Sequence, residues 1–176
     1  MSQLRFRPAT EADIATLHAL VESAYRGTSA KAGWTHEADL LDGQRTDTQE
    51  LATIVADPQR QILLGLDGDD LAGCVCVESK GQGRAYLGML TVDPQRQAGG
   101  LGRQLIVAAE DWARGPFGAS VMEMTVIAQR AELIAYYGRR GYALTPETRP
   151  FPLHDPRFGE AKRDDLYFVV MEKALV

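Results

Sequence analysis

Three glycines within four positions, Gly99, Gly100 and Gly102, form the segment of this sequence that best suits anion binding. They follow an apolar run that ends at Val92 and precede a helical pattern that begins at Leu101. The first N–H groups of a helix have no partner within the helix, and the helix dipole favours negative charge there. Because glycine also lets an oxyanion approach the backbone, the segment predicts a phosphate-binding turn.

The ligand of this turn is narrowed by what the neighbouring residues lack. A P-loop requires a Lys-Ser or Lys-Thr pair after its last glycine, and none follows here. A dinucleotide-binding fingerprint requires a glycine where Leu105 stands, and it belongs to a parallel βαβ unit rather than to an antiparallel meander. Arg96 and Arg103 could add positive charge, whereas a turn without any ligand is the alternative.

The elements that must position the turn follow from apolar periodicity and from turn residues. Strands are predicted at 4–7, 62–64, 71–78, 84–92, 121–127, 142–144 and 166–171, and helices at about 14–27, 48–56, 101–114 and 133–140. Gly68 and Gly81–Gly83 mark the turns of a three-stranded antiparallel meander. The proline-rich stretch 146–165 predicts a long loop, which is either functional or a surface excursion at an oligomer contact.

The composition is that of an ordinary globular protein and predicts one domain, residues 1–176. A net charge of −5 argues against a nucleic-acid or membrane-surface partner. Cys74 and Cys76 share one face of a predicted strand and are expected to be buried. The histidines show no metal-ligand spacing, so no metal is expected. Without an apolar run long enough for a signal peptide or a membrane span, a cytoplasmic location is expected.

Two segments carry a resemblance to a known family. Gln97-x-x-Gly100-x-Gly102, after a strand that ends in Leu-Thr-Val-Asp-Pro, is similar to the Gln/Arg-x-x-Gly-x-Gly/Ala pyrophosphate loop of the GNAT superfamily of N-acetyltransferases. The segment 133–142, Leu-Ile-Ala-Tyr-Tyr-Gly-Arg-Arg-Gly-Tyr, resembles that family's next helix, which carries a tyrosine and closes in Gly-Phe or Gly-Tyr.

The resemblance extends over nearly the whole chain in element order, and it implies the fold class. That class is α+β with α/β/α layers, the GNAT-like acyl-CoA N-acyltransferase fold. Its sheet is mixed but mostly antiparallel, with six to seven strands and about four helices, and its fourth and fifth strands are splayed.

The resemblance also implies acetyl-CoA as co-substrate, and it assigns residues to it. Backbone groups of Leu90 and Val92 would pair with the pantetheine arm. The pyrophosphate loop would comprise Gln97, Ala98, Gly99, Gly100, Leu101, Gly102 and Arg103. Tyr137 matches the family tyrosine that protonates the departing thiolate, which a phenol with a pKa of about 10 can do. A purely packing role for Tyr137 is the alternative.

The group that takes the proton of the attacking amine stays open at this level. Several family members place Glu or His on the strand before the loop, and this chain has Tyr86 near that place. No carboxylate occurs from 84 to 92, so Glu78 on the preceding strand and Glu123 on the following one are the alternatives. A water chain to a distant base, or an amine that arrives unprotonated, would also serve.

The resemblance also implies that the acceptor binds between the loops at 25–37 and 146–165. Candidate acceptor-binding residues, apart from Tyr86, are Tyr25, Trp34, Thr35 and Glu37 on the first loop and Phe151, His154, Arg157 and Arg163 on the second. Aromatic residues with Glu37 would suit a cationic acceptor, whereas the arginines would suit one that carries a carboxylate. The acceptor is therefore left open.

The function implied is transfer of the acetyl group of acetyl-CoA to a primary amine of a small molecule or peptide. Direct attack in a ternary complex is favoured over an acyl-cysteine, since no histidine or helix N-terminus accompanies Cys74 or Cys76 in the sequence. The alternative is a non-catalytic acyl-CoA-binding or sensor module on the same fold. Because family members are often dimers, a homodimer is among the expected states.

Overall fold

The computed structural model describes residues 3–25, 41–42, 46–152, 160–162 and 164–175. The strands are β1 (Arg5–Pro8), β2 (Leu41–Asp42), β3 (Arg60–Asp67), β4 (Asp70–Gly81), β5 (Arg84–Val92), β6 (Val121–Ile127), β7 (Ala143–Pro150), β8 (Glu160–Ala161) and β9 (Tyr167–Ala174). The helices are the 3₁₀-helix η1 (Glu11–Asp13), α1 (Ile14–Tyr25), α3 (Thr48–Ala56), the 3₁₀-helix η2 (Pro94–Gly99), α4 (Leu101–Arg114) and α5 (Ala131–Arg139).

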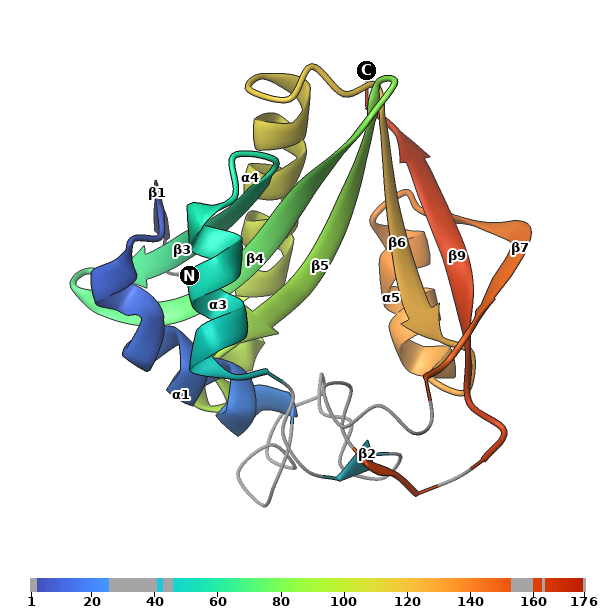
Figure 1. Cartoon of the computed structure of the whole chain (residues 1–176), viewed down its shortest axis with the longest axis horizontal. Coiled ribbons are helices and arrows are strands. Elements are labelled where there is room, and N and C mark those ends of the chain that lie inside the picture. Colours follow the sequence, from blue (N-terminus) through green and yellow to red (C-terminus); the bar gives the residue numbers. More distant parts are fainter. Residues whose placement is uncertain (1–2, 26–40, 43–45, 153–159, 163, 176) are drawn as a thin grey trace.

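Seven strands form one twisted sheet in the order β1-β3-β4-β5-β6-β9-β7 (Figure 1). Neighbouring strands are antiparallel except for β5 and β6, which pair in parallel. A separate two-stranded ribbon joins β2 to β8. The mixed, mostly antiparallel sheet predicted from the sequence is therefore confirmed, and its one parallel pair is the fourth and fifth strand of that prediction.

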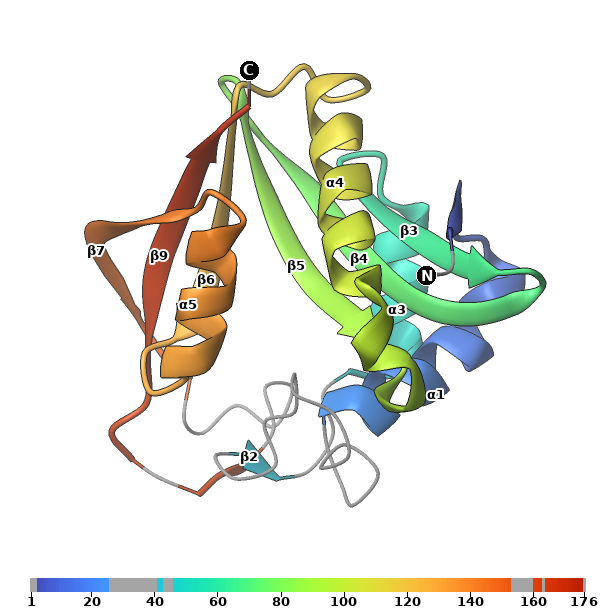
Figure 2. The ribbon, with the colours of Figure 1, turned by 180° about the vertical axis from the view of Figure 1, so that it is seen from behind.

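Helices cover both faces of the sheet. α1 and α3 pack on one face of the β3–β5 half (Figure 1), while α4 and α5 lie on the opposite face (Figure 2). One core cluster lies under α1 and α3 and includes Leu17 and Ile62. The other lies under α4 and α5 and includes Leu105 and Met122. Each helix thus buries its apolar stripe against one face of the sheet, as amphipathic helices do.

Close packing of α4 on β4 depends on Gly73. A Cβ at this position would lie 2.6 Å from the carbonyl oxygen of Thr91 and 2.7 Å from Cδ1 of Leu105. The absent side chain therefore lets Leu105 approach the sheet, and it sets how close the N-terminal half of α4 lies to the strands. Cys74 and Cys76 are also buried on β4, which confirms the burial that the sequence predicts for them.

Local signals in the sequence explain where the first helices begin. Asp47 caps α3, since its carboxylate accepts a hydrogen bond from the N–H of Glu50 at 2.6 Å. Before α1, the N–H of Thr10 donates to Asp13 at 2.8 Å, and Arg7 holds the same carboxylate with two bonds of 2.9 and 3.0 Å. The Arg7 guanidinium lowers the pKa of Asp13 to about 2.

The long loop predicted at 146–165 starts later than expected, which corrects that prediction. β7 runs on through Pro146 to Pro150, which pairs with Tyr167. Proline lacks an N–H and is tolerated on edge strands and at irregularities in the ladder. β7 is an edge strand of the sheet, and its register shifts between Leu144 and Thr148, so both conditions hold here.

Candidate active site

The site begins where β5 and β6 separate. Their parallel register runs from the pair Arg84–Val121 to the pair Tyr86–Glu123, after which the two strands diverge (Figure 1). A cleft of about 540 Å³ lies at this opening, and residues of both strands line it, 86–90 on β5 and 124–127 on β6. The splay expected of this strand pair is therefore confirmed, and it creates a cavity through the middle of the sheet.

A β-bulge shapes the β5 side of the cleft. On β4 one residue separates Cys74 from Cys76, whereas their partners Thr91 and Gly88 on β5 are separated by two. Met89 sits in the bulge with φ of 52°, and its carbonyl accepts a hydrogen bond from the Thr91 hydroxyl at 2.9 Å. A bulge bends its strand and increases the local twist, so it turns β5 where it leaves β6.

The glycine segment lies at the end of β5, in the strand-to-helix position that the sequence predicts. η2 follows the strand, and Gly100, with φ of 72°, is the N-cap of α4. Only glycine adopts this left-handed conformation at no steric cost. Gly100, Gly102 and Arg103 line a second cavity of about 1090 Å³ that extends along α4. The side chain of Leu101 belongs to the core, so only its backbone is available to a ligand.

Arg96 does not supply positive charge to a ligand of the glycine segment, a role that the sequence leaves open to it. Its guanidinium is held by Asp67 at 2.8 Å, Asp70 at 3.4 Å and Asp93 at 3.7 Å. These carboxylates neutralise its charge and tie η2 to the turn between β3 and β4. Arg96 is therefore an anchor of the glycine segment, and Arg103 is the arginine of that segment that lines a cavity.

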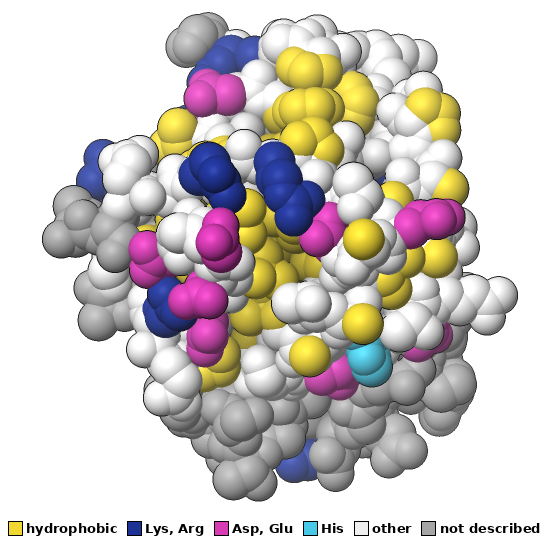
Figure 3. All heavy atoms as spheres, turned by 90° about the vertical axis from the view of Figure 1, so that its left-hand side faces the viewer, with side chains coloured by type: hydrophobic (Ala, Val, Ile, Leu, Met, Phe, Trp, Pro, Cys, Tyr) yellow, Lys and Arg dark blue, Asp and Glu magenta, His cyan; other side chains and the backbone are white. Residues whose placement is uncertain are grey.

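Charge is mixed on the side of the molecule that carries β1. Figure 3 shows hydrophobic side chains in a hollow there, with Lys and Arg side chains among Asp and Glu side chains around it. Among the residues drawn in colour on this side, the basic side chains form no continuous surface.

The two adjacent tyrosines on α5 line different cavities. Tyr137 is buried and lines the cleft between β5 and β6. Its ring lies edge to face with that of Tyr142, and the two ring centroids are 6.2 Å apart. Tyr136 lines the cavity along α4 instead, next to Arg140. Burial raises the pKa of Tyr136, while Arg140 and Arg139 oppose this effect.

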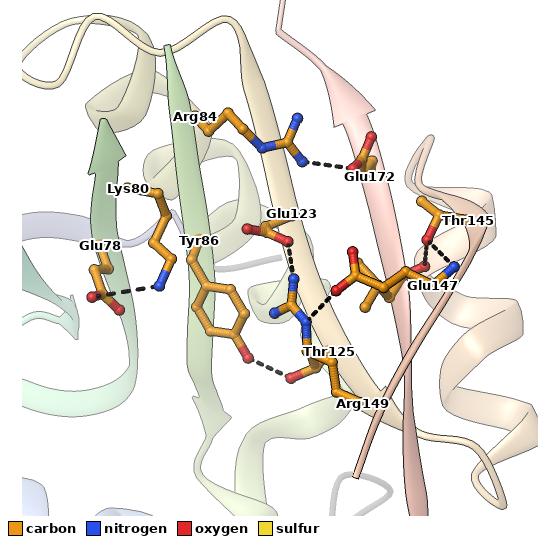
Figure 4. A network of polar contacts seen from close by, with 11 residues as sticks. Glu78, Lys80, Arg84, Tyr86, Glu123, Thr125, Thr145, Glu147, Arg149 and Glu172 are labelled. Atoms are coloured by element: carbon orange, nitrogen blue, oxygen red, sulfur yellow. Dashed lines mark hydrogen bonds and ion pairs between the residues drawn. The ribbon is translucent and has the colours of Figure 1, made fainter. Parts of the chain in front are cut away.

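A polar network lies beside the cleft on β5, β6 and β7, on the face of the sheet that α4 and α5 do not cover, which we call the open face (Figure 4). The hydroxyl of Tyr86 on β5 is hydrogen-bonded to that of Thr125 on β6, across the point where the strands part. Arg149 on β7 binds Glu123 at 2.9 Å and Glu147 at 2.7 Å. Both bonds raise the pKa of Arg149, that to Glu147 more strongly, and Arg149 lowers the pKa of Glu147.

The remaining candidates divide into those that the structure places and those that it does not. Tyr86 and Phe151 line the cleft, and Leu90 lines it from the β5 side. Val92 is buried at the end of β5. Tyr25 ends α1 and Gln97 and Ala98 lie in η2, but their side chains are outside the described part of the chain. Residues wholly outside it are Trp34, Thr35, Glu37, His154, Arg157 and Arg163.

Four polar or charged residues in the described lining of the cleft were not candidates from the sequence. They are Lys80, Thr125, Arg130 and Arg149. Alternation of Glu123 and Thr125 with apolar residues along β6 was the signal that could have marked a polar face. Arg149 had no such signal, because its place follows from the register of β7 on β9. In the described residues, no group of three or more His, Cys, Asp or Glu side chains is arranged to hold a metal ion.

A family model described as "Acetyltransferase (GNAT) family" matches residues 17–142, well over half of the chain. The chain belongs to the GNAT acetyltransferase family. The match includes the separated strands, the glycine segment and Tyr137. Among curated proteins no significant match is found. No helix in the described segments of this GNAT protein is long and apolar enough to cross a membrane.

Solved structures share the GNAT fold along nearly the entire chain. YncA of Salmonella typhimurium, a candidate acetyltransferase solved with its cofactor acetyl-CoA, is 20% identical, covers 99% of this chain and 95% of its own, and has a TM-score of 0.69. The ribosomal-protein-S18-alanine N-acetyltransferase of Escherichia coli is 15% identical, and the match covers 98% of this chain and 94% of that one with a TM-score of 0.71. An N-acetyltransferase of Staphylococcus aureus Mu50 is 10% identical, and the match covers 99% of each chain with a TM-score of 0.74. At these identities the likeness establishes the fold, with its predicted layers.

Proposed function

We propose that this GNAT family member transfers the acetyl group of acetyl-CoA to a primary amine by direct attack in a ternary complex. The observation that carries the proposal is the arrangement along β5. This strand forms one wall of the cleft, ends in the glycine segment at the N-terminus of α4, and faces a cleft that Tyr137 lines from α5. The glycine segment thus follows directly on the strand whose residues line the cleft that contains the buried phenol of Tyr137.

Binding of acetyl-CoA is assigned to the end of β5 and the start of α4. Backbone N–H groups from 98 to 103 would hold the pyrophosphate, with Arg103 adding positive charge. The left-handed Gly100 at the helix N-cap fits such a ligand, because it brings backbone rather than side chain to the surface. Backbone groups of Leu90 and Val92 would pair with the pantetheine arm, which leads the acetyl group into the cleft.

Tyr137 is assigned as the general acid. When the amine has attacked the thioester carbonyl and the C–S bond breaks, the thiolate needs a proton, which a phenol in the cleft wall can deliver. A neutral amine nitrogen can attack a thioester carbonyl directly, so no covalent enzyme intermediate is required. Cys74 and Cys76 are buried on β4, and neither lines the cleft, which supports direct attack over an acyl-cysteine.

The test is release of CoA in the presence of acetyl-CoA and a panel of primary amines, small molecules and peptides. Tyr137→Phe should lower kcat by about 100-fold with little change in the KM for acetyl-CoA. Tyr136→Phe is the matched control, since the neighbouring ring lines the other cavity, and its kcat should stay within about twofold of the wild type.

Two outcomes would overturn parts of this proposal. Tight CoA binding without turnover on any amine would favour a non-catalytic acyl-CoA-binding module. Equal kcat values for Tyr137→Phe and the wild type would remove Tyr137 from the mechanism. The homodimer and the cytoplasmic location expected from the sequence stay predictions.

A further inference from the structure

The proposed reaction needs a group that removes a proton from the acceptor, and the inference below rests on that proposed function. A primary amine of pKa about 10 is almost entirely an ammonium ion at neutral pH. Its nitrogen has no lone pair for attack until one proton leaves. The cleft must therefore offer a proton acceptor within reach of the incoming nitrogen, directly or through one water.

Glu78 is the carboxylate that the cleft lining offers for this step. Within the part of the chain that the structure describes, it is the only Asp or Glu that lines the cleft. Glu123 is 5% exposed, does not line the cleft, and has Arg149 at 2.9 Å from Oε2. Glu147 is likewise held by Arg149 and lies outside the cleft lining. Of Glu78 and Glu123, the two carboxylates that the sequence leaves as alternatives, the structure therefore favours Glu78.

The register places Glu78 beside the point where the sheet opens. Glu78 on β4 pairs directly with Tyr86 on β5, and such partners have Cβ atoms about 5 Å apart on the same face of the sheet. Tyr86 belongs to the last β5–β6 pair before the strands part, and its hydroxyl reaches across to Thr125. Figure 4 shows both side chains on the open face, with Glu78 one strand away from the opening.

Gly88 keeps this arrangement open. A Cβ at Gly88 would lie 3.2 Å from Cε1 of Tyr86, so the ring of Tyr86 lies close over the glycine. The ring of Tyr86 thus lies against Gly88, and its hydroxyl is hydrogen-bonded to Thr125 across the gap. This ring forms the cleft wall between Glu78 and β6.

The charged groups around Glu78 leave its carboxylate accessible. The ammonium of Lys80 lies 3.8 Å from the Glu78 carboxylate, and both side chains are more than a third exposed, so solvent screens the contact and leaves it weak. Arg60, the partner of Glu78 on β3, is turned to Asp57 at 2.9 Å. Two arginines line the same cleft, Arg149 with its two glutamates and the buried Arg130. An incoming ammonium can replace Lys80 at little cost.

We propose that Glu78 is the catalytic base of this protein and that it acts from β4. One N–H bond of the ammonium breaks, its proton moves to a carboxylate oxygen of Glu78 and on to solvent, and the nitrogen lone pair forms the C–N bond. As the C–S bond breaks, the sulfur keeps its electron pair and takes a proton from Tyr137. The second proton lost by the nitrogen restores the phenol, so one amide, one thiol and one released proton result.

The test compares Glu78→Gln with the wild type, using acetyl-CoA and an amine that the panel shows to be turned over. At pH 7 the variant should lose about 100-fold or more in kcat. The loss should shrink as the pH rises toward the pKa of the amine, because a neutral amine needs no base. Glu147→Gln is the matched control, as it removes a carboxylate of the same network outside the cleft, and its kcat should be unchanged. Thermal shifts with CoA should be equal for all three proteins.

Several results would overturn the assignment. A loss in kcat that is constant with pH would indicate a structural role. A loss confined to the KM of the amine would indicate electrostatic attraction alone. Full activity of Glu78→Gln alongside an active wild type would refute only the role of Glu78, whereas a wild type that turns over no amine would refute the proposed function as well.

Discussion

Replacing Tyr142 with phenylalanine removes one hydroxyl from a buried polar cluster that ties α4 to the start of β7 and to β9. Its hydroxyl donates to Glu110 at 2.9 Å, and Lys173 lies 3.0 Å from the same carboxylate oxygen. Glu110 is only 4% exposed, so water cannot replace the lost donor. Burial, more than the nearby Glu110, raises the pKa of Tyr142, so the phenol stays protonated and donates throughout the neutral range.

The structure sets the size of the effect. A hydrogen bond to a charged group contributes about 1.5–3 kcal/mol, and its loss leaves one lone pair of Glu110 unsatisfied. Lys173 remains in place, so the cost stays below the roughly 3–5 kcal/mol of an uncompensated buried charge. For a chain of this size, 1 kcal/mol corresponds to about 2–4 °C, so Tyr142→Phe should lower Tm by roughly 3–12 °C.

Urea unfolding and calorimetry of Tyr142→Phe measure this loss. Tyr167→Phe is the control, because Tyr167 is 44% exposed and its replacement should change the free energy of unfolding by less than about 0.5 kcal/mol. A Tyr142→Phe protein as stable as the wild type would refute the reasoning that the cluster stabilises the packing of α4. An equal loss in both variants would indicate a general effect of removing a tyrosine hydroxyl rather than the loss of the bond to Glu110.

Two further substitutions test the glycine segment and the start of α1. Gly100→Ala should lower the free energy of unfolding by about 1–2 kcal/mol and raise the KM for acetyl-CoA, because a φ of 72° disfavours a side chain. The control is Gly118→Ala, which has a φ of 60° and open space around a Cβ and should lose similar stability without a change in that KM. Equal KM shifts in the two variants would contradict the role of the glycine segment. Asp13 has a pKa of about 2 in the folded protein, below the ordinary value near 3.9, so its stabilising effect is complete above the ordinary value and is lost as pH falls toward 2. Asp13→Asn should therefore be less stable than the wild type at pH 7, and urea unfolding should show the gap closing between about pH 4 and pH 2; a gap that is independent of pH would argue against the ion pair with Arg7.

Features that depend on neighbours in sequence were predictable, and those that depend on register were not. The glycine segment and Tyr137 lie within short motifs on one strand-to-helix turn and one helix, so their placement followed from local pattern. The bonds of Arg149 to Glu123 and of Tyr86 to Thr125 join residues 26 and 39 positions apart. They exist because of how β7 pairs with β9 and how far β5 pairs with β6, which no local pattern encodes.

The extent of β7 shows the same limit for a single element. Two prolines made 146–150 resemble loop, yet an edge strand with a shifted register accommodates both. The choice between Glu78 and Glu123 likewise needed the fold. Both lie on strands that are otherwise mostly apolar, and only the arrangement of β4, β6 and β7 shows that Glu78 lines the cleft while Glu123 is bound by Arg149.

A crystal structure of the protein with CoA tests the central claim most directly. The account predicts the pyrophosphate on the backbone N–H groups at the start of α4, the pantetheine arm between β5 and β6, and the sulfur within hydrogen-bond reach of the Tyr137 hydroxyl. A pantetheine arm outside the cleft between β5 and β6, or a sulfur remote from Tyr137, would contradict it.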